Sequence, residues 1–243
     1  LKIKGDYDGS FDHFPQQLKL LEINGFYFDK PLDNLPQSLK HLIVYGYIFN
    51  QNLDNLPKRL RQLEIISENF DKNLDNLPEN LKVLIIMSSK FNKKLDKLPR
   101  YLTELEIGKY RKADSITHFT QKLDNLPDGL KILRIGGDIF NNTLDNLPNN
   151  LTEMRIHCNN FDQKINKLPQ SLIILKIGWD LFNQPVDKLP QRLKSLKIKG
   201  DSFNQPLDSL PQSLKDLVIV GSGFDQSTDS IMRRLKYIEI TEY

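Results

Sequence analysis

The chain has 243 residues, of which 27% are charged and 39% are hydrophobic, and its formal net charge is only +3. So small an excess of positive charge does not by itself indicate a nucleic-acid or membrane partner. No run of about 18 apolar residues occurs, so the sequence predicts no membrane-spanning helix. Cys158 is the single cysteine, which excludes an internal disulfide and favours a reducing, cytoplasmic location.

A proline-marked unit repeats along the chain with a period of 21 residues, interrupted by one interval of 28. Leu stands three residues after each marker, an apolar residue stands six after it, and Ile or Val stands eight after it. Met232 takes the place of an eleventh proline. Self-similarity at such a period indicates a stacked repeat array, in which each unit packs on its neighbours. The markers are Pro15, Pro36, Pro57, Pro78, Pro99, Pro127, Pro148, Pro169, Pro190 and Pro211.

The Leu-x-Ile part of each unit predicts a short strand, because apolar and polar residues alternate and Ile is β-branched. About twelve such strands in a parallel ladder would form one long sheet, with extended or 3₁₀ segments on the opposite side of each coil. We therefore predict a single solenoid domain over residues 1–243. In chain order, the strands are expected around residues 1–3, 21–23, 42–44, 63–65, 84–86, 105–107, 133–135, 154–156, 175–177, 196–198, 217–219 and 238–240.

Two columns follow each predicted strand. The eighth residue before each marker is Tyr7 in the first unit and Phe in the others, which we interpret as an aromatic stack in the core. The next residue is Asp or Asn in ten of eleven units, and we expect these side chains to close the bend after the strand. The Phe column comprises Phe28, Phe49, Phe70, Phe91, Phe119, Phe140, Phe161, Phe182, Phe203 and Phe224.

A third column places Asp three residues before the markers, with Asn166 as the exception. We favour a structural role, in which each carboxylate caps backbone N–H groups of a short 3₁₀ turn. The alternative is a stacked calcium site, but the Gly-Gly-x-Gly-x-Asp nonapeptide of such sites does not occur. We therefore expect no metal and no other cofactor.

Two departures from the period concern the start of the chain and its middle. Leu1 and Ile3 match Leu196 and Ile198 of a later unit, so we expect the chain to begin inside a unit of a longer protein. Seven extra residues within 108–118 account for the long interval, and sequence drift or a binding loop could explain them. The candidate binding residues of this insertion are Lys109, Tyr110, Arg111 and Lys112.

The repeated unit resembles a known repeat family. The segments 28–32, 182–186 and 203–207 read F-D-K-P-L, F-N-Q-P-V and F-N-Q-P-L, and each leads into Asp-x-Leu-Pro. Together with the unit L-P-x-x-L-x-x-L-x-I, they look like the FNIP repeat of social amoebae and amoeba-infecting giant viruses. The resemblance implies a leucine-rich-repeat-like solenoid that recognises other proteins. In that family the array often follows an F-box, which docks on a cullin ubiquitin ligase.

The resemblance leaves the biological role open. One expectation is the substrate-recognition part of an F-box ubiquitin ligase adaptor, with the F-box upstream of residue 1. The alternative is a structural or assembly component of a giant virus particle, which could self-associate, and either role places the chain in the cytoplasm of the cell or of the viral host. Catalysis has little support, since the four His are scattered and no nucleophile elbow or P-loop occurs. We expect a protein that is not an enzyme.

Specificity is expected on the fifth, seventh and ninth residues after each marker, which flank the buried Leu and Ile and should point away from the core. These positions are apolar and acidic in the first half of the chain and basic in the second half. Exposed apolar groups rimmed by charge mark docking sites, whereas strand propensity or a solvated charged strip are the plainer interpretations. A basic fourth column that includes Lys19 and Lys40 makes nucleic acid a weaker alternative. The candidate partner-binding residues are Glu22, Ile43, Tyr45, Glu64, Ile66, Val83, Ile85, Met87, Glu106, Arg134, Arg155, Lys176 and Lys197.

Overall fold

The computed structural model describes residues 1–108, 116–178 and 180–242. The chain divides into two compact units, Leu1–Gln121 and Lys122–Tyr243, and each is considered by itself. Both units are repeat solenoids with parallel strands and almost no helix, as the sequence predicted. The assignment of residues 1–243 to a single domain stays a prediction. Among the described residues, no helix is long and apolar enough to cross a membrane.

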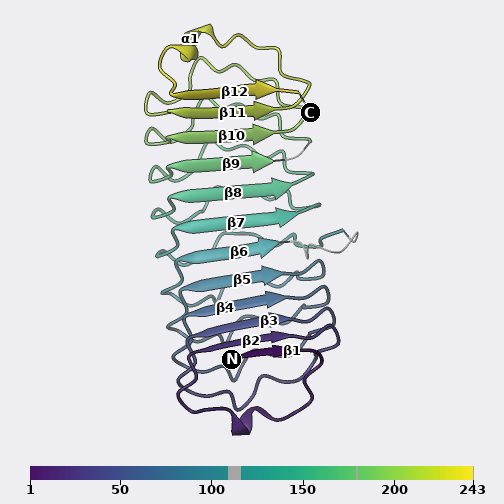
Figure 1. Ribbon diagram of the computed structural model, residues 1–243. Coiled ribbons are helices and arrows are strands. Elements are labelled where there is room, and N and C mark those ends of the chain that lie inside the picture. Colours follow the sequence, from purple (N-terminus) through teal and green to yellow (C-terminus); the bar gives the residue numbers. More distant parts are fainter. Residues whose placement is uncertain (109–115, 179, 243) are drawn as a thin grey trace. The chain divides into compact units, whose positions relative to one another are not determined.

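The first unit contains six strands that run parallel and pair in chain order (Figure 1). The register repeats every 21 residues, so that Leu42 lies beside Leu63 and Val44 beside Ile65. Each coil therefore places the same column of the sequence at the same point of the sheet. The elements are β1 (Lys2–Lys4), the 3₁₀ helix η1 (Phe11–His13), β2 (Leu20–Asn24), β3 (His41–Tyr45), β4 (Gln62–Ile66), β5 (Val83–Met87) and β6 (Glu104–Gly108).

The second unit repeats this arrangement with six further parallel strands. A short helix, α1, occupies the place where Met232 substitutes for the marker proline. The elements are β7 (Ile132–Gly137), β8 (Glu153–Cys158), β9 (Ile174–Gly178), β10 (Ser195–Lys199), β11 (Asp216–Val220), α1 (Asp229–Met232) and β12 (Tyr237–Thr241).

The sequence period explains which side chains form the core. Along β4, Leu63 and Ile65 are fully buried, whereas Gln62, Glu64 and Ile66 are half-buried on the other face of the sheet. The same alternation occurs in most strands, because successive side chains of a strand point to opposite faces. The marker proline begins a tight turn, for example from the Pro57 carbonyl to the Leu60 N–H at 3.0 Å. The remainder of each coil is mostly extended, and Phe11–His13 is the single 3₁₀ helix among the described residues.

The Phe column forms an aromatic stack in each unit, which confirms the sequence interpretation. Phe70 is fully buried, and its ring lies 6.1 Å from Phe49 and 6.0 Å from Phe91, with interplanar angles of 7° and 10°. In the second unit, Phe161 and Phe182 stack in the same way at 6.0 Å. Offset stacking of this kind adds to the apolar area that each ring buries, so the column ties neighbouring coils together.

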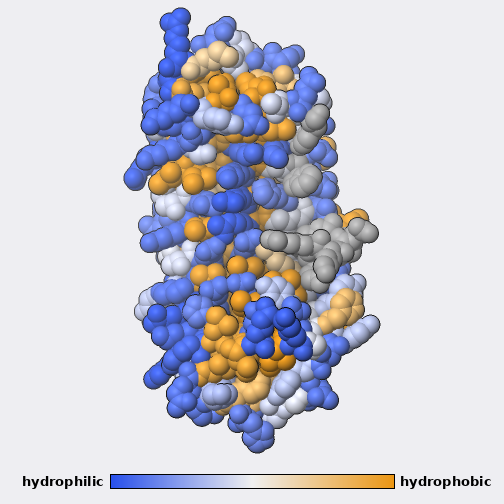
Figure 2. All heavy atoms as spheres, in the orientation of Figure 1, coloured by the Kyte–Doolittle hydropathy of each residue, from blue (hydrophilic) through white to orange (hydrophobic). Residues whose placement is uncertain are grey.

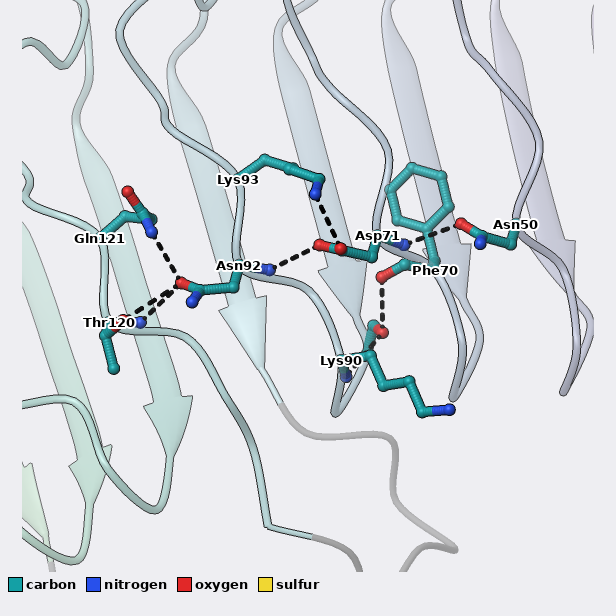
Figure 3. A network of polar contacts seen from close by, with 9 residues as sticks. Asn50, Phe70, Asp71, Lys90, Asn92, Lys93, Thr120 and Gln121 are labelled. Carbon is teal, nitrogen blue, oxygen red and sulfur yellow. Dashed lines mark hydrogen bonds and ion pairs between the residues drawn. The ribbon is translucent and has the colours of Figure 1, made fainter.

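The Asp/Asn column that follows the Phe column links one coil to the next. Asn50 Oδ1 accepts the backbone N–H of Asp71 at 3.0 Å, and Asp71 Oδ1 accepts that of Asn92 at 3.0 Å (Figure 3). Asn92 Oδ1 in turn accepts the N–H of Thr120, across the long interval. The prediction that these side chains close their own bend is therefore wrong, since the recipient N–H belongs to the following coil. We call this arrangement the Asx ladder.

The Asp column before the markers also acts between coils. Asp33 Oδ1 accepts from the Asn55 side chain at 2.8 Å, and Asp54 accepts from the Asn76 side chain at 3.0 Å. Asp145 instead forms an ion pair with Lys167 at 3.0 Å. The predicted capping of backbone N–H groups is wrong for these carboxylates, because their partners are side chains 22 residues later.

Candidate functional site

The sheet face opposite the core carries the predicted binding residues. Every candidate on a described strand lies at an outward position, and the candidates are half-buried by their neighbours in the sheet. These side chains are not needed to fill the core, which is made by the buried Leu, Ile and Phe columns. The outward face is therefore free to differ from coil to coil, and the two units use it differently.

In the first unit, carboxylates and apolar side chains alternate across neighbouring strands. Glu22, Ile43, Glu64, Ile85 and Glu106 are consecutive partners in register from β2 to β6. This alternation separates successive carboxylates by two strand spacings, or roughly 10 Å, which limits their mutual repulsion. Glu22 pairs with Lys2 at 2.6 Å, and Glu64 accepts a hydrogen bond from Gln62.

A second outward column adds larger apolar groups to this surface. Tyr45, Ile66 and Met87 are partners in register on β3, β4 and β5. Met87 extends over Gly108, where an added Cβ would come within 2.8 Å of the Met87 sulfur. Figure 2 shows apolar side chains gathered over the N-terminal strands β2–β5. We call the side chains of Ile43, Tyr45, Ile66, Val83, Ile85 and Met87 the apolar face.

Sequence reasoning missed an aromatic group next to the apolar face. Phe26 and Tyr27 follow β2 and are 54% and 65% exposed. Phe26 stacks on Tyr47, which follows β3, with ring centroids 4.8 Å apart and an interplanar angle of 4°. Both rings stand eleven residues after a marker proline, so their shared column was the available signal. Exposed aromatic side chains of this kind often anchor protein interfaces.

In the second unit, basic side chains occupy neighbouring strands without alternation. Arg134, Arg155, Lys176 and Lys197 are consecutive partners in register from β7 to β10. Glu153 lies beside this row, 3.2 Å from an Arg134 nitrogen and 2.8 Å from Arg155 Nε. Figure 2 shows hydrophilic side chains along the middle of this part of the face. We call the four cations the basic row.

The basic row borders a pocket of about 340 Å³ on β8, β9 and β10. Gly178 presents no side chain here, and its register partners are His157 on one side and Lys199 on the other. An added Cβ at Gly178 would stand 3.2 Å from His157 Cδ2, so the glycine keeps this space open. The lining consists of Arg155, His157, Lys176, Ile177, Gly178, Lys197 and Lys199.

The electrostatics of the pocket follow from this crowding of cations. Partial burial of the His157 ring, and then the positive charges of Arg155, Lys176, Lys199 and Lys197, lower the pKa of His157 below its ordinary value of 6.5. On β7, Gly136 is the register partner of His157 and adds no charge. Burial, followed by the charge of Arg155, also lowers the pKa of Lys176, although Glu153 opposes the shift. Both shifts signal an excess of positive charge.

Other candidate chemistry is sparse among the described residues. No three His, Cys, Asp or Glu side chains come together there as a metal site. Cys158 is buried, and burial followed by the charge of Asp138 raises its pKa to about 12, so the thiol is held in its unreactive form. The basic fourth column lies at the start of the strands, where Lys82 Nζ stands 4.7 Å from the Tyr101 ring centroid. The insertion candidates Lys109, Tyr110, Arg111 and Lys112 lie outside the described residues.

Comparisons with known proteins support the repeat assignment. Residues 28–68 and 182–220 match the family model of the FNIP Repeat, which confirms the predicted resemblance in both units. None of the curated proteins compared with the chain shows significant similarity to it. The crystal structure of CroV588, described as a novel circular LRR protein structure, is similar with 25% identity and a TM-score of 0.47. That match covers 95% of this chain and 47% of CroV588, so the chain spans about half the length of that protein.

Proposed function

We propose that this chain, which is built of FNIP repeats in a leucine-rich-repeat-like solenoid, is a non-catalytic module that binds another protein through its outward sheet face. A solenoid offers a long surface whose residues can vary without disturbing the packing of the coils. The outward columns of this chain vary in that way, whereas the buried columns stay constant. We also propose a reducing, intracellular setting, in keeping with the single cysteine.

The observation that carries the proposal is the apolar face of the first unit. Ile43 and Ile85 remain half-buried rather than buried, although they stand on strands whose other face forms a complete core. Apolar side chains on a sheet face gain little for folding there, but they lose their remaining contact with water when a partner covers them. The surrounding carboxylates and the exposed Phe26 and Tyr27 would then supply the rim and the aromatic anchors of an interface.

The test compares partner capture by matched variants. The purified chain, the double variant Ile43→Asp/Ile85→Asp and the control Asn73→Asp/Lys94→Asp are each used as bait in a host-cell lysate. The control places the same two new carboxylates on exposed positions away from the sheet face. We expect the first variant to lose the partner that the parent chain and the control both retain, with a melting curve close to that of the parent.

Equal capture by all three baits would contradict the assignment of the sheet face. Loss of folding in the Ile43→Asp/Ile85→Asp variant would instead show that these side chains belong to the core. The family resemblance implies two narrower roles, substrate selection for a ubiquitin ligase adaptor or assembly of a viral particle. The oligomeric state separates them, since a monomer over a wide concentration range favours the first role and stable self-association favours the second.

A further inference from the structure

The basic row of the second unit is unusual because its charges are not balanced. Neighbouring strands lie about 4.8 Å apart, and like charges directly opposite each other destabilise a sheet by a few tenths of a kcal/mol to about 1 kcal/mol per pair. Three such pairs occur in succession between β7 and β10. The first unit avoids this cost by alternating Glu with Ile, so the repeat itself does not require it.

A single carboxylate serves this part of the face. Glu153 holds Arg134 and Arg155, whereas Lys176, Lys197 and Lys199 form no ion pair with any residue that the structure describes. The Arg155 Nε hydrogen is withdrawn from water, and although Glu153 lies 2.8 Å away, its direction does not suit a hydrogen bond. The pocket thus holds surplus positive charge together with an unused donor.

The shape of the pocket suits a small anion on a side chain. Gly178 leaves a gap between His157 and Lys199, while Lys176 and Lys197 stand beside it in the next outward column. The volume of about 340 Å³ is at the low end of the range for ligand pockets. Arg, two or three Lys and a His supply forked and single N–H donors from several directions, which is the pattern that phosphate oxygens require.

We propose that this pocket binds the phosphate group of a phosphorylated side chain on a partner protein. The proposal rests on the proposed function, because it assumes that the sheet face receives a protein. A phosphorylated Ser or Thr carries a charge of about −1.5 to −2 and three strong acceptor oxygens, more than one Asp or Glu can offer. Such a group would neutralise the basic row and provide acceptors for Lys176, Lys197 and Arg155 at once.

The extent of the row favours a single phosphate over a nucleic-acid backbone. The four cations span three strand spacings, or roughly 14 Å. In the same column, Val218 on β11 and Glu239 on β12 follow Lys197, so the positive track ends there within the unit. A nucleic-acid strand gains affinity by repeated phosphate contacts along a continuous basic groove.

The experiment measures binding of three probes to the whole chain by calorimetry. They are a short Gly/Ser-rich peptide with one phosphoserine, the same peptide unphosphorylated, and a single-stranded oligouridylate. We expect the phosphopeptide alone to bind appreciably, and Lys176→Gln or Lys197→Gln to weaken it about tenfold or more. Gly178→Ala should also weaken it while leaving every charge in place, whereas the exposed control Lys188→Gln should not.

A second reading follows His157 by NMR. The bound phosphate should raise the pKa of His157 from its lowered value, because a nearby negative charge favours the imidazolium form. The unphosphorylated peptide should leave it unchanged. Equal affinity for both peptides, or tighter binding of oligouridylate that Lys176→Gln abolishes, would overturn the proposal. If the phosphopeptide fails while Ile43→Asp/Ile85→Asp still loses its partner, the phosphate site is refuted and the proposed function stands.

Discussion

The Asx ladder predicts how replacement of Asp71 should affect stability. Asp71 Oδ1 accepts the Asn92 N–H at 3.0 Å, and Oδ2 lies 2.8 Å from Lys93 Nζ (Figure 3). A hydrogen bond to a charged group contributes about 1.5–3 kcal/mol, and an ion pair as exposed as this one contributes about 0–1 kcal/mol. Asp71→Ala should therefore lower the free energy of unfolding by about 2 kcal/mol. For a chain of this size, that loss corresponds to roughly 4–8 °C in Tm.

The matched control is Asp71→Asn, which keeps the Oδ1 acceptor and removes the charge. The ladder already uses Asn at positions 50 and 92 in the same unit, so the amide fits the column. We expect this variant to lose less than about 1 kcal/mol, attributable to Lys93 alone. Thermal and urea unfolding followed by circular dichroism measure both changes. If Asp71→Asn were as destabilising as Asp71→Ala, the ladder would owe its strength to charge, and the acceptor argument would be refuted.

Two further predictions concern the aromatic stack and His157. Phe70→Ala should cost about 3–5 kcal/mol because it opens a cavity in the stack, while Phe26→Ala, at a 54% exposed position, should cost less than about 0.5 kcal/mol in the same unfolding assay. Because the folded chain lowers the pKa of His157, the unfolded chain binds a proton first as the pH falls below about 6.5, so stability should decrease there. His157→Gln should remove that part of the pH dependence, and an unchanged pH profile would show that the ring is not strained by its cationic neighbours.

The sequence was sufficient for the columns of the fold because the period repeats the same environment in every coil. Leu63, Ile65 and Phe70 could be assigned to the core from their spacing alone, and the structure buries all three. The hydrogen-bond partners of the Asx ladder could not be assigned in this way. An Asp or Asn after a strand fits both a local bend and a bond to the next coil, and only the distance between coils decides between them.

The candidate site was partly predictable for a similar reason. The alternation of buried and outward positions was enough to place Ile43 and Arg155 on the sheet face. The pocket was missed because it depends on an absent side chain, since Gly178 matters through the space that it leaves beside His157. A glycine at an outward strand position between basic units is the signal that could have indicated it.

The most direct test of the central claim places a photo-crosslinking amino acid at one position at a time and identifies what it captures. Position 85 lies on the apolar face, and position 94 lies on an exposed, extended part of the same unit away from the sheet. The account predicts that a probe at 85 crosslinks to a partner protein, and that a probe at 94 does not. Crosslinks to the partner from 94 and none from 85 would show that the outward sheet face is not the recognition surface.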